Sequence, residues 1–596
     1  MAVHNPWEKG SKPVGTPTQR RHALRRLMQY ILRYPWVLLS AMVLMVLSNY
    51  LELLGPWLSG LAVDAIGERP GGVDFQTVIF YCVQMVICFV FSTASAYILS
   101  LIMIRLSQRI AHRMRCDVFS RLMDLPVHYF DTHTSGDIIS HISYDIDTIH
   151  ASLSSDLLQA VTSLFTIIGS LVMMLRIAPS LVVVFAITVP VSLLFSRWMM
   201  HKVQPLFRKR SMHLGILSGF AEEKVSAHQN IKIYHCEEAM IECFDACNTQ
   251  AVTSYYASEY YASMTGPTVN FINNLSLALI AVFGSLQFLQ GRITLGALSS
   301  FVLYSRKFSG PINELANLFG ELQSALAAAE RVFNLMDEFP EPADAPDAIT
   351  LENVRGAVRF QDVTFGYLPQ RPVLKNLTLD VPSGATVAIV GPTGVGKTTL
   401  INLLMRFYDA QQGHIFIDGK DIRQLTRQSL RRAFSMVLQD TWLFSGTVLE
   451  NLTYGKPGAT REEAIAAAKA AWLDDDIQAL SQGYDTLINE NGASLSQGQK
   501  QLLSIARAML IDAQILILDE ATSCVDTRTE KHIQDAMLQL MRGRTSFVIA
   551  HRLSTIYNAD MILVLKDGEI AERGTHETLL RKNGIYAELF RAQFEA

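Results

Sequence analysis

The chain has 596 residues, which is enough for more than one domain. With 49 % apolar residues and a mean hydropathy of +0.21, it is more apolar than a soluble protein of this size usually is, so membrane-spanning segments must be sought first. A net charge of −4 and a pI near 6.4 give no support for nucleic acid as a partner. The seven cysteines form no C-x-x-C pair, so neither a metal site nor a disulfide scaffold is indicated.

The first 34 residues are polar and basic. Within them, residues 20–33 put apolar side chains on one helical face and arginines mostly on the other. This pattern is typical of a helix that lies in the cytoplasmic interface of a membrane. The segment lacks the short apolar core and the small-residue cleavage site of a secretory signal. We therefore expect residues 1–34 to form a cytoplasmic N-terminus with an interfacial helix.

Five apolar stretches follow, and each is about long enough to cross a bilayer of roughly 30 Å at 1.5 Å per residue. A sixth, residues 293–305, is short and ends at Arg306 and Lys307, so hydropathy alone gives it little support. Glu52 lies about 24 Å along the first stretch from Trp36, and we interpret it as part of a wet gate near the outer side, with contact to a substrate as the alternative. The five stretches are residues 36–54, 77–104, 157–175, 177–196 and 266–289.

Two long polar segments, residues 105–156 and 197–265, separate these stretches. They contain few glycine or proline breaks and show recurrent apolar periodicity, which predicts helical extensions of the spans rather than loops. The stretch that begins at Asp337 is instead acidic, rich in proline and poor in bulky apolar residues. That composition is typical of a linker, which we expect over residues 337–352.

An α/β domain is predicted for residues 353–596. Alternating side chains at residues 358–365 indicate strands, and helical patterns interleave from residue 400 onward. A short apolar run at 387–390 leads into residues 391–399, which match G-x-x-x-x-G-K-[ST]. Strand, glycine loop and helix form the context that this phosphate-binding pattern requires, because successive backbone N–H groups curl around phosphate oxygens at a helix N-terminus.

The loop residues carry the phosphate chemistry. Lys397 is expected to reach the β and γ phosphates of ATP, and the hydroxyl of Thr398 to ligate Mg²⁺. ATP and Mg²⁺ are therefore the expected cofactors. The residues predicted to bind nucleotide in this loop are Gly391, Thr393, Gly394, Val395, Gly396, Lys397, Thr398 and Thr399.

The phosphate loop also constrains the number of spans. ATP is cytoplasmic, so the basic N-terminus and the α/β domain must both face the cytoplasm, and the number of spans must be even. The three segments expected in the cytoplasm carry 7, 5 and 7 Lys plus Arg, whereas the loops around residues 59–76, 176–180 and 290–294 carry one each. We therefore expect a transmembrane domain of six helices within residues 35–336.

Three further motifs follow the phosphate loop. Residues 495–499 read Leu-Ser-Gln-Gly-Gln and open a helical run, residues 515–520 form a buried strand ending in two acids, and His551 ends another strand. This domain resembles the ATPase domain of ATP-binding-cassette (ABC) transporters, and the whole chain resembles a bacterial half-transporter of the multidrug and lipid exporter type. The implied fold is an α-helical membrane bundle of six spans with long cytoplasmic extensions, followed by an α/β P-loop ATPase domain.

The resemblance assigns roles to residues around the nucleotide. It implies that Tyr367 stacks on adenine, that Asp519 holds Mg²⁺ through water, and that Glu520 polarises the water that attacks the γ-phosphorus. Gln439 would touch Mg²⁺ and the attacking water, and His551 would contact the γ-phosphate. Glu520, His551 and Gln439 are thus the expected catalytic residues, and Thr398, Gln439 and Asp519 the expected metal ligands.

The resemblance also implies a partner. Ser496, Gly498 and Gln499, at a helix N-terminus, would meet the γ-phosphate held by the phosphate loop of another subunit, and Asp526 would lie in a loop that crosses the interface. One chain then cannot complete an active site, so the expected partner is a second half-transporter, identical or different. Gln497 departs from the family's commoner glycine, and with an intact second acid this resembles the catalytically complete half of bacterial heterodimers.

Two stretches are expected to join the membrane and ATPase domains. Residues 126–131 resemble the family's first coupling helix, and residues 229–234 resemble the region of the second. Both lie in the polar segments that are expected to extend the spans into the cytoplasm.

These features predict ATP-driven export of amphipathic substrates, such as drugs, lipids or hydrophobic peptides. The protein would be a multi-pass protein of the bacterial cytoplasmic membrane with both termini in the cytoplasm. Two alternatives remain open: the same fold working as an importer of a metal chelate, and an ATP-gated channel or regulatory subunit.

Overall fold

The computed structural model describes residues 17–67, 73–368, 370–439, 441–488, 495–519, 527–549 and 556–594. The chain divides into two compact units. The helical unit comprises Met1–Asp124 and Thr134–Glu338, and the α/β unit comprises Leu125–His133 and Phe339–Ala596.

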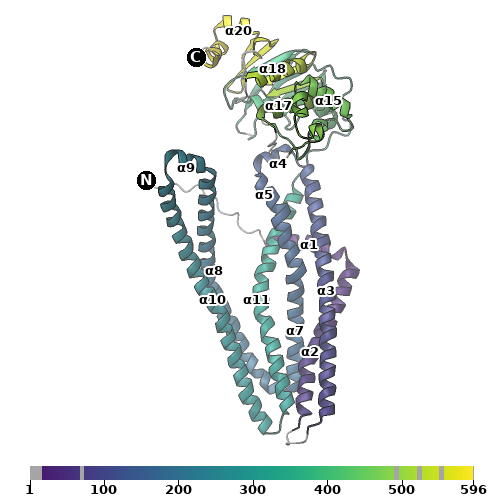
Figure 1. The fold of residues 1–596 in the computed structure, drawn as a ribbon, viewed down its shortest axis with the longest axis vertical. Coiled ribbons are helices and arrows are strands. Elements are labelled where there is room, and N and C mark those ends of the chain that lie inside the picture. The colour runs from purple at the N-terminus through teal and green to yellow at the C-terminus, as the bar shows by residue number, and fades with distance from the viewer. Residues whose placement is uncertain are drawn as a thin grey trace. The chain divides into compact units, whose positions relative to one another are not determined.

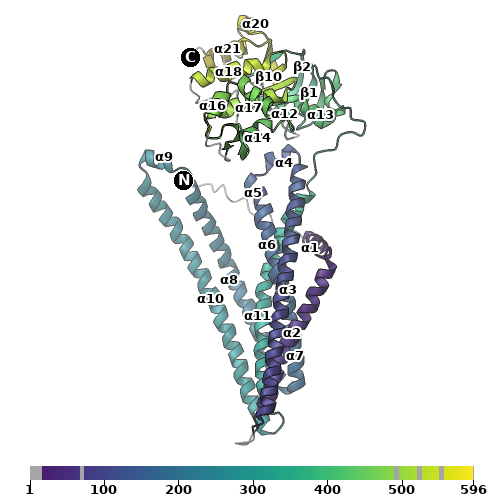
Figure 2. The ribbon, with the colours of Figure 1, turned by 45° about the vertical axis from the view of Figure 1, so that its right-hand side comes forward.

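Long helices make up the helical unit (Figure 1). Its elements are α1 (Pro17–Leu32), α2 (Pro35–Asp64), α3 (Phe75–Met123), α5 (Ser135–Ser140), the π-helical η1 (His141–Asp145), α6 (Ile146–Ala151), the π-helical η2 (Ser152–Asp156), α7 (Leu157–Ile177), α8 (Pro179–Ser226), α9 (His228–Tyr234), α10 (Glu237–Leu289) and α11 (Leu295–Asp337). α8 and α10 run side by side and are joined by α9, and toward α9 this hairpin diverges from the bundle of α2, α3, α7 and α11 (Figure 2).

Five helical stretches are long and apolar enough to cross a membrane, namely α2, α3, Ser135–Ile177, α8 and α10. α11 was the span with least support from hydropathy, and it is not among these five. It nevertheless continues for 43 residues and packs against α2 and α7. Composition therefore identifies five candidate spans, and α11, which packs against α2 and α7, stays the predicted sixth.

The predicted helical extensions are confirmed. α3 and α8 run on without a break into the polar segments that follow their apolar portions, as far as Met123 and Ser226. α10 likewise begins at Glu237, about 29 residues before the expected apolar stretch. In each extension the backbone N–H and C=O groups stay hydrogen-bonded within the helix, although the side chains are now mostly polar.

Polar contacts fix α11 against α2. At the start of α11, Thr294 Oγ1 donates to Asp64 Oδ2 over 2.8 Å. Farther along, the buried Tyr304 hydroxyl donates to the carbonyl of Leu53 over 2.5 Å. In an apolar environment such side-chain bonds replace the water that is missing, so they set the register of the two helices.

A buried carboxylate ties α11 to η1. Asp145 is 2 % exposed; its Oδ2 accepts from Arg331 Nε over 3.0 Å and faces His141 Nδ1 at 2.7 Å. Burial alone would raise the pKa of the Asp145 carboxyl, but the hydrogen bonds from His141 and Arg331 hold this pKa below its ordinary value. Arg331 lies 36 residues after the start of α11, about 54 Å along the helix and so outside a bilayer.

The strands of the α/β unit form two main sheets. They are β1 (Val358–Phe365), β2 (Leu374–Val381), β3 (Thr386–Val390), β4 (Gln412–Ile417), β5 (Lys420–Asp421), β6 (Phe434–Val437), β7 (Gly446–Thr447), β8 (Leu487–Ile488), β9 (Ile515–Asp519), β10 (Thr545–Ile549), β11 (Met561–Lys566) and β12 (Glu569–Gly574). The larger sheet has the order β12-β11-β3-β10-β9-β6 and is parallel except for β12. The second, antiparallel sheet has the order β2-β1-β4-β5, and β7 pairs with β8.

Helices pack around these sheets. They are α4 (Val127–Thr132), α12 (Lys397–Leu404), the 3₁₀ turn η3 (Ile422–Gln424), α13 (Arg427–Arg432), α14 (Val448–Thr453), α15 (Arg461–Ala470), α16 (Asp474–Gln478), the 3₁₀ turn η4 (Gly483–Asp485), α17 (Gln497–Ile511), α18 (Thr527–Met541), α20 (His576–Lys582) and α21 (Ile585–Phe594). Phe360 of β1, Ile389 of β3 and Leu404 of α12 belong to one apolar core, which anchors the segment on either side of the phosphate loop.

Two acids of the expected linker lie against the α/β unit. Arg431 Nη2 pairs with Glu341 Oε1 at 2.5 Å, and Arg427 Nη1 pairs with Asp344 Oδ1 at 2.9 Å. The Arg427 side chain is only 9 % exposed, so this pairing is largely shielded from solvent. The acidic, proline-rich segment is thus held by arginines of α13.

We predict that Arg331→Gln destabilises the helical unit, because it leaves the buried Asp145 carboxylate short of a counter-charge. Removing one partner of a buried pair typically costs about 3–5 kcal/mol. The melting temperature of the purified protein in detergent should fall, whereas the matched variant Arg208→Gln, at an exposed position of α8, should leave it unchanged. Equal melting temperatures for the two variants would contradict a structural role for the pair.

Candidate functional site

The phosphate loop leaves β3, which lies between the parallel strands β10 and β11. Ligands of open α/β sheets bind at the carboxyl ends of such strands. A Cβ on Gly391 would lie 2.5 Å from the carbonyl oxygen of Leu565. Gly396 has a φ of +105°, and a Cβ there would lie 2.9 Å from the Leu374 side chain. Glycine is therefore required at both positions by the path of the loop.

Lys397 begins α12 and reaches back over the loop. Its Nζ donates to the carbonyls of Gly391 over 2.7 Å and Pro392 over 3.1 Å. Burial lowers the pKa of this ammonium, and the nearby Asp519 carboxylate acts in the opposite direction. Lys397 is therefore close enough to Asp519 for the two charges to influence each other. An ammonium has three donor hydrogens, so one is left for a phosphate oxygen.

The remaining loop residues differ in access. Thr393, Gly394 and Thr398 are exposed and can meet a ligand, whereas Val395 packs into the apolar core. Only the backbone of Val395 is therefore suited to the role predicted for it. Thr399 is also buried, and its hydroxyl lies 3.3 Å from that of Tyr367.

Gln439 and Asp519 follow neighbouring strands at one edge of the sheet. β6 and β9 are parallel, with Val437 opposite Leu518. Asp519 is the last residue of β9, and the exposed Gln439 comes two residues after β6. Their oxygens, with the exposed Thr398 hydroxyl, are of the hard type that Mg²⁺ prefers. The residues present therefore fit the predicted ion.

Residues 496–499 form the N-terminus of α17. The Ser496 hydroxyl accepts from the backbone N–H of Gln499 over 3.2 Å, and the Gln499 side-chain oxygen accepts from the Ser496 N–H over 2.9 Å. This reciprocal capping box fixes the first turn of the helix. The Gln499 side chain, predicted to meet nucleotide, thus has a structural task as well, and Gly498 is buried beside it.

Tyr367 stands beside the phosphate loop. Its side chain is 41 % exposed, and its hydroxyl accepts from Asn402 Nδ2 of α12 over 3.4 Å. The ring meets that of Phe365 edge to face, with centroids 5.2 Å apart. A half-exposed ring held next to α12 fits the predicted contact with adenine.

Sequence reasoning missed Tyr408. Its ring meets that of Tyr367 at 90° with centroids 5.1 Å apart, and its hydroxyl donates to Asp131 of α4. Burial and the Asp131 carboxylate raise the pKa of this phenol. His128 of α4 also lies edge-on to Tyr408, at 6.0 Å. The signal was an aromatic residue shortly after the phosphate-loop helix, but nothing local linked it to a segment 277 residues away.

Tyr408 therefore connects two predicted features. The segment that resembles the first coupling helix belongs to the α/β unit and touches the tyrosine expected under adenine through one intervening ring. The second such segment, α9, contains no buried residue, and both Ile233 and Tyr234 are well exposed.

Three predicted site residues lie outside the part of the chain that the structure describes. They are Glu520, Asp526 and His551.

A P-loop with its strand and helix, an acid at the end of another parallel strand of the same sheet, and a unit of long apolar helices together define a membrane transporter that uses a nucleoside triphosphate. Two family models match the chain: the ABC transporter transmembrane region over residues 38–312 and the ABC transporter domain over residues 374–523. The chain belongs to the ABC transporter family, and it hydrolyses ATP to drive transport.

Relatives refine this assignment. The chain is 46 % identical over 485 residues to the fatty acid ABC transporter ATP-binding/permease protein of Mycobacterium tuberculosis, covering 81 % of this chain and 76 % of that protein. It is 35 % identical over 577 residues to the ATP-dependent lipid A-core flippase of Nitrosococcus oceani, covering 96 % and 95 %.

A solved structure agrees with these relatives. The chain resembles a bacterial Atm1-family ABC exporter with ATP bound, at a TM-score of 0.76 and 31 % identity over 94 % of this chain and 98 % of that one. The fold and the relatives together are those of bacterial ABC exporters.

We predict that Gly396→Ala weakens ATP binding by about tenfold or more, which corresponds to about 1.4 kcal/mol, because an added Cβ would lie 2.9 Å from the Leu374 side chain and would displace the loop that binds the phosphates. The matched control is Gly384→Ala, which has a φ of +77° but open space around the added Cβ. Equilibrium binding of a non-hydrolysable ATP analogue should separate the two variants. Equal affinities would show that the close packing of Gly396 is unimportant.

We also predict that Tyr408→Phe and Asp131→Ala are not additive, since each removes the same hydrogen bond. A loss near 1 kcal/mol lowers the melting temperature of a unit of this size by about 2 °C, and the double variant should melt no lower than the worse single variant. Thermal unfolding of all four proteins in detergent measures this coupling. Fully additive shifts would contradict the contact between α4 and Tyr408.

Proposed function

We propose that this chain is one half of a dimeric ATP-driven exporter of lipid-like amphiphiles in the bacterial cytoplasmic membrane. The observation that carries the proposal is that a unit with long apolar helices is joined to a P-loop unit, in which Lys397 begins the helix after β3 and Asp519 ends β9 of the same parallel sheet. The names of the relatives, a fatty acid transporter and a lipid A-core flippase, support a lipid-like substrate. The proposed domains are the N-terminal segment 1–34, the transmembrane domain 35–336, the linker 337–352 and the ATPase domain 353–596.

In this proposal the phosphate loop binds the ATP phosphates through its backbone N–H groups and Lys397, and Tyr367 stacks on adenine. Thr398, Gln439 and Asp519 would hold Mg²⁺. The ion, when bound, would neutralise charge on the β and γ phosphates. Glu520 would take a proton from the attacking water, and His551 would orient the γ-phosphate.

The second half of the site would come from another subunit. Ser496 and Gly498, at the rigidly capped start of α17, would meet the γ-phosphate held across the interface, with Asp526 beside it. The exposed Ile233 and Tyr234 of α9 support such a partner, because apolar side chains at the tip of a long polar extension need a covering surface. Closing of two ATPase domains around ATP would then move the attached helices and open the cavity outward.

The orientation follows from charge and from ATP. Basic residues gather in the N-terminal segment and in the two helical extensions. Segments rich in Lys and Arg favour the cytoplasmic side of the membrane, so all three are placed there. Both termini would therefore be cytoplasmic.

We predict that Glu520→Gln lowers ATP hydrolysis on the order of 10² to 10⁴-fold while ATP binding stays intact, because general-base catalysis is lost and the phosphate contacts are not. The measurement is phosphate release by the chain reconstituted alone in lipid, with ATP binding as the control. Near-normal hydrolysis by the variant would overturn the assignment of Glu520.

The same preparation tests the partner and the direction of transport. Robust hydrolysis by the chain alone means that two copies build complete sites, and its absence from well-folded protein points to a different half-transporter. ATP added outside inside-out vesicles should drive lipid-like amphiphiles into the lumen. Uptake in the opposite direction would indicate an importer, and ohmic current a channel.

A further inference from the structure

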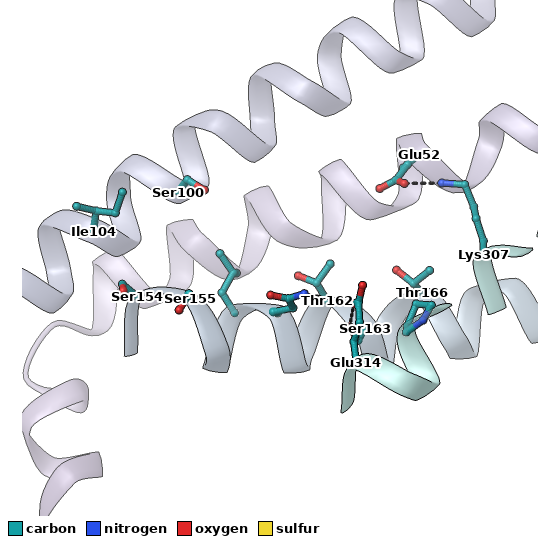
Figure 3. A pocket seen from close by; sticks show the side chains of 13 residues that line it. Glu52, Ser100, Ile104, Ser154, Ser155, Thr162, Ser163, Thr166, Lys307 and Glu314 are labelled. Atoms are coloured by element: carbon teal, nitrogen blue, oxygen red, sulfur yellow. Dashed lines mark hydrogen bonds and ion pairs between the residues drawn. The ribbon is translucent and has the colours of Figure 1, made fainter. Parts of the chain in front are cut away.

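The helical unit contains a cavity of about 710 Å³ that is lined mostly by polar and charged residues, and its volume is within the range of small-molecule sites. Four elements of the bundle form it: α2, α3, the η2–α7 segment and α11 (Figure 3). The residues that line it are Glu52, Ser100, Ile104, Ser154, Ser155, Leu158, Gln159, Thr162, Ser163, Thr166, Lys307, Pro311 and Glu314.

The cavity lies at membrane depth. Glu52 comes 12 residues before the end of α2 and Lys307 comes 12 residues after the start of α11, which places both about 18 Å from the same end of the bundle. Glu314 lies 19 residues, about 28 Å, along α11. Glu52 is thus deeper than the sequence led us to expect, because α2 continues ten residues beyond the expected span. The cavity extends from mid-membrane toward the expected cytoplasmic side.

The charges around the cavity do not balance. Lys307 Nζ donates to Glu52 Oε1, so these two charges neutralise each other (Figure 3). Glu314 receives only long hydrogen bonds, from Gln159 Nε2 at 3.3 Å and Ser163 Oγ at 3.4 Å. Among the thirteen lining residues, Lys307 is the only cation. The lining therefore carries one excess negative charge, at Glu314.

We propose that this cavity is a subsite for the head of an amphiphile that carries a permanent positive charge, with Glu314 as its counter-ion. This inference rests on the proposed function as an exporter of amphiphiles. An acid within a membrane domain usually faces a partner or a water-filled path, and a ligand cation would supply the charge that the protein does not. The hydroxyls of Ser100, Thr162 and Thr166 can solvate the head, while Leu158 and Ile104 meet apolar carbon.

An anionic head fits this lining less well. It would have to displace Glu52 from Lys307 and then sit near two free carboxylates, which like-charge repulsion opposes in a medium of low dielectric constant. The substrate class proposed here therefore differs from the one named for the fatty acid transporter among the relatives.

The experiment uses the full chain in lipid nanodiscs and two ions of nearly the same size and shape, tetraphenylphosphonium and tetraphenylborate. Binding of each is measured by equilibrium dialysis and corrected with empty nanodiscs, because both ions partition into lipid. The variants are Glu314→Gln, which removes the charge with little change of shape, and Glu52→Gln, which frees Lys307. The matched control is Glu321→Gln, an exposed acid two turns farther along α11 that does not line the cavity.

Glu314→Gln should weaken binding of the phosphonium by about tenfold, which corresponds to 1.4 kcal/mol, and should leave binding of the borate unchanged or tighter. Glu52→Gln should also strengthen binding of the borate, and Glu321→Gln should change neither. If the Glu314→Gln and Glu321→Gln variants bind the phosphonium equally well, the proposal that Glu314 is the counter-ion of a cationic head is wrong.

The outcomes for the subsite and for the exporter are separable. Loss of ATP hydrolysis in Glu520→Gln tests the proposed function, and this test does not depend on the result for phosphonium binding. Charge-selective binding without ATP-driven movement of the phosphonium would keep the subsite and overturn export. If the chain hydrolyses ATP and moves other amphiphiles, but Glu314→Gln does not change binding of the phosphonium, export is kept and the subsite is overturned.

Discussion

A bilayer offers no hydrogen-bond partners, and this constraint shapes the helical unit. Backbone groups must bond within the segment that crosses the membrane, so the chain forms long helices, and polar side chains between them must find one another. Tyr304 meets the carbonyl of Leu53, and Lys307 meets Glu52. The same constraint directs attention to Glu314, because an acid within a membrane domain usually faces a partner or a water-filled path, and Lys307, the one cation that lines this cavity, pairs with Glu52 instead.

The α/β unit depends on a different constraint, the meeting of parallel strand ends at one edge of a sheet. β3 delivers the phosphate loop there, and β6 and β9 deliver Gln439 and Asp519. Tyr408 contacts both Tyr367, which is expected to bind adenine, and Asp131 of α4. In the sequence α4 lies between two parts of the helical unit, but it belongs to the α/β unit.

Much of the fold could be predicted, since hydropathy and periodicity are local properties. The long helical extensions were predicted and found, whereas five of the six predicted spans are long and apolar enough to cross a membrane and α11 is not among them. The end of α2 was not predicted, because its final ten residues begin with Gly-Pro and contain a second glycine, which is typical of a turn or loop. Lys307 was taken as the end of a span, although it lies within α11 and pairs with Glu52. Composition marked Glu341 and Asp344 as linker, but it could not reveal the arginines of α13 that hold them.

The sequence by itself determined the nucleotide chemistry, because residues 391–399 carry the glycines, lysine and hydroxyls in one continuous loop between a strand and a helix. It also determined that helices span a membrane, since long apolar runs have no other stable place. Only the tertiary structure decided which charges meet in the cavity and which ring touches α4. The pairs Glu52–Lys307 and Asp131–Tyr408 are 255 and 277 residues apart, and such contacts depend on how helices pack, which local patterns do not encode.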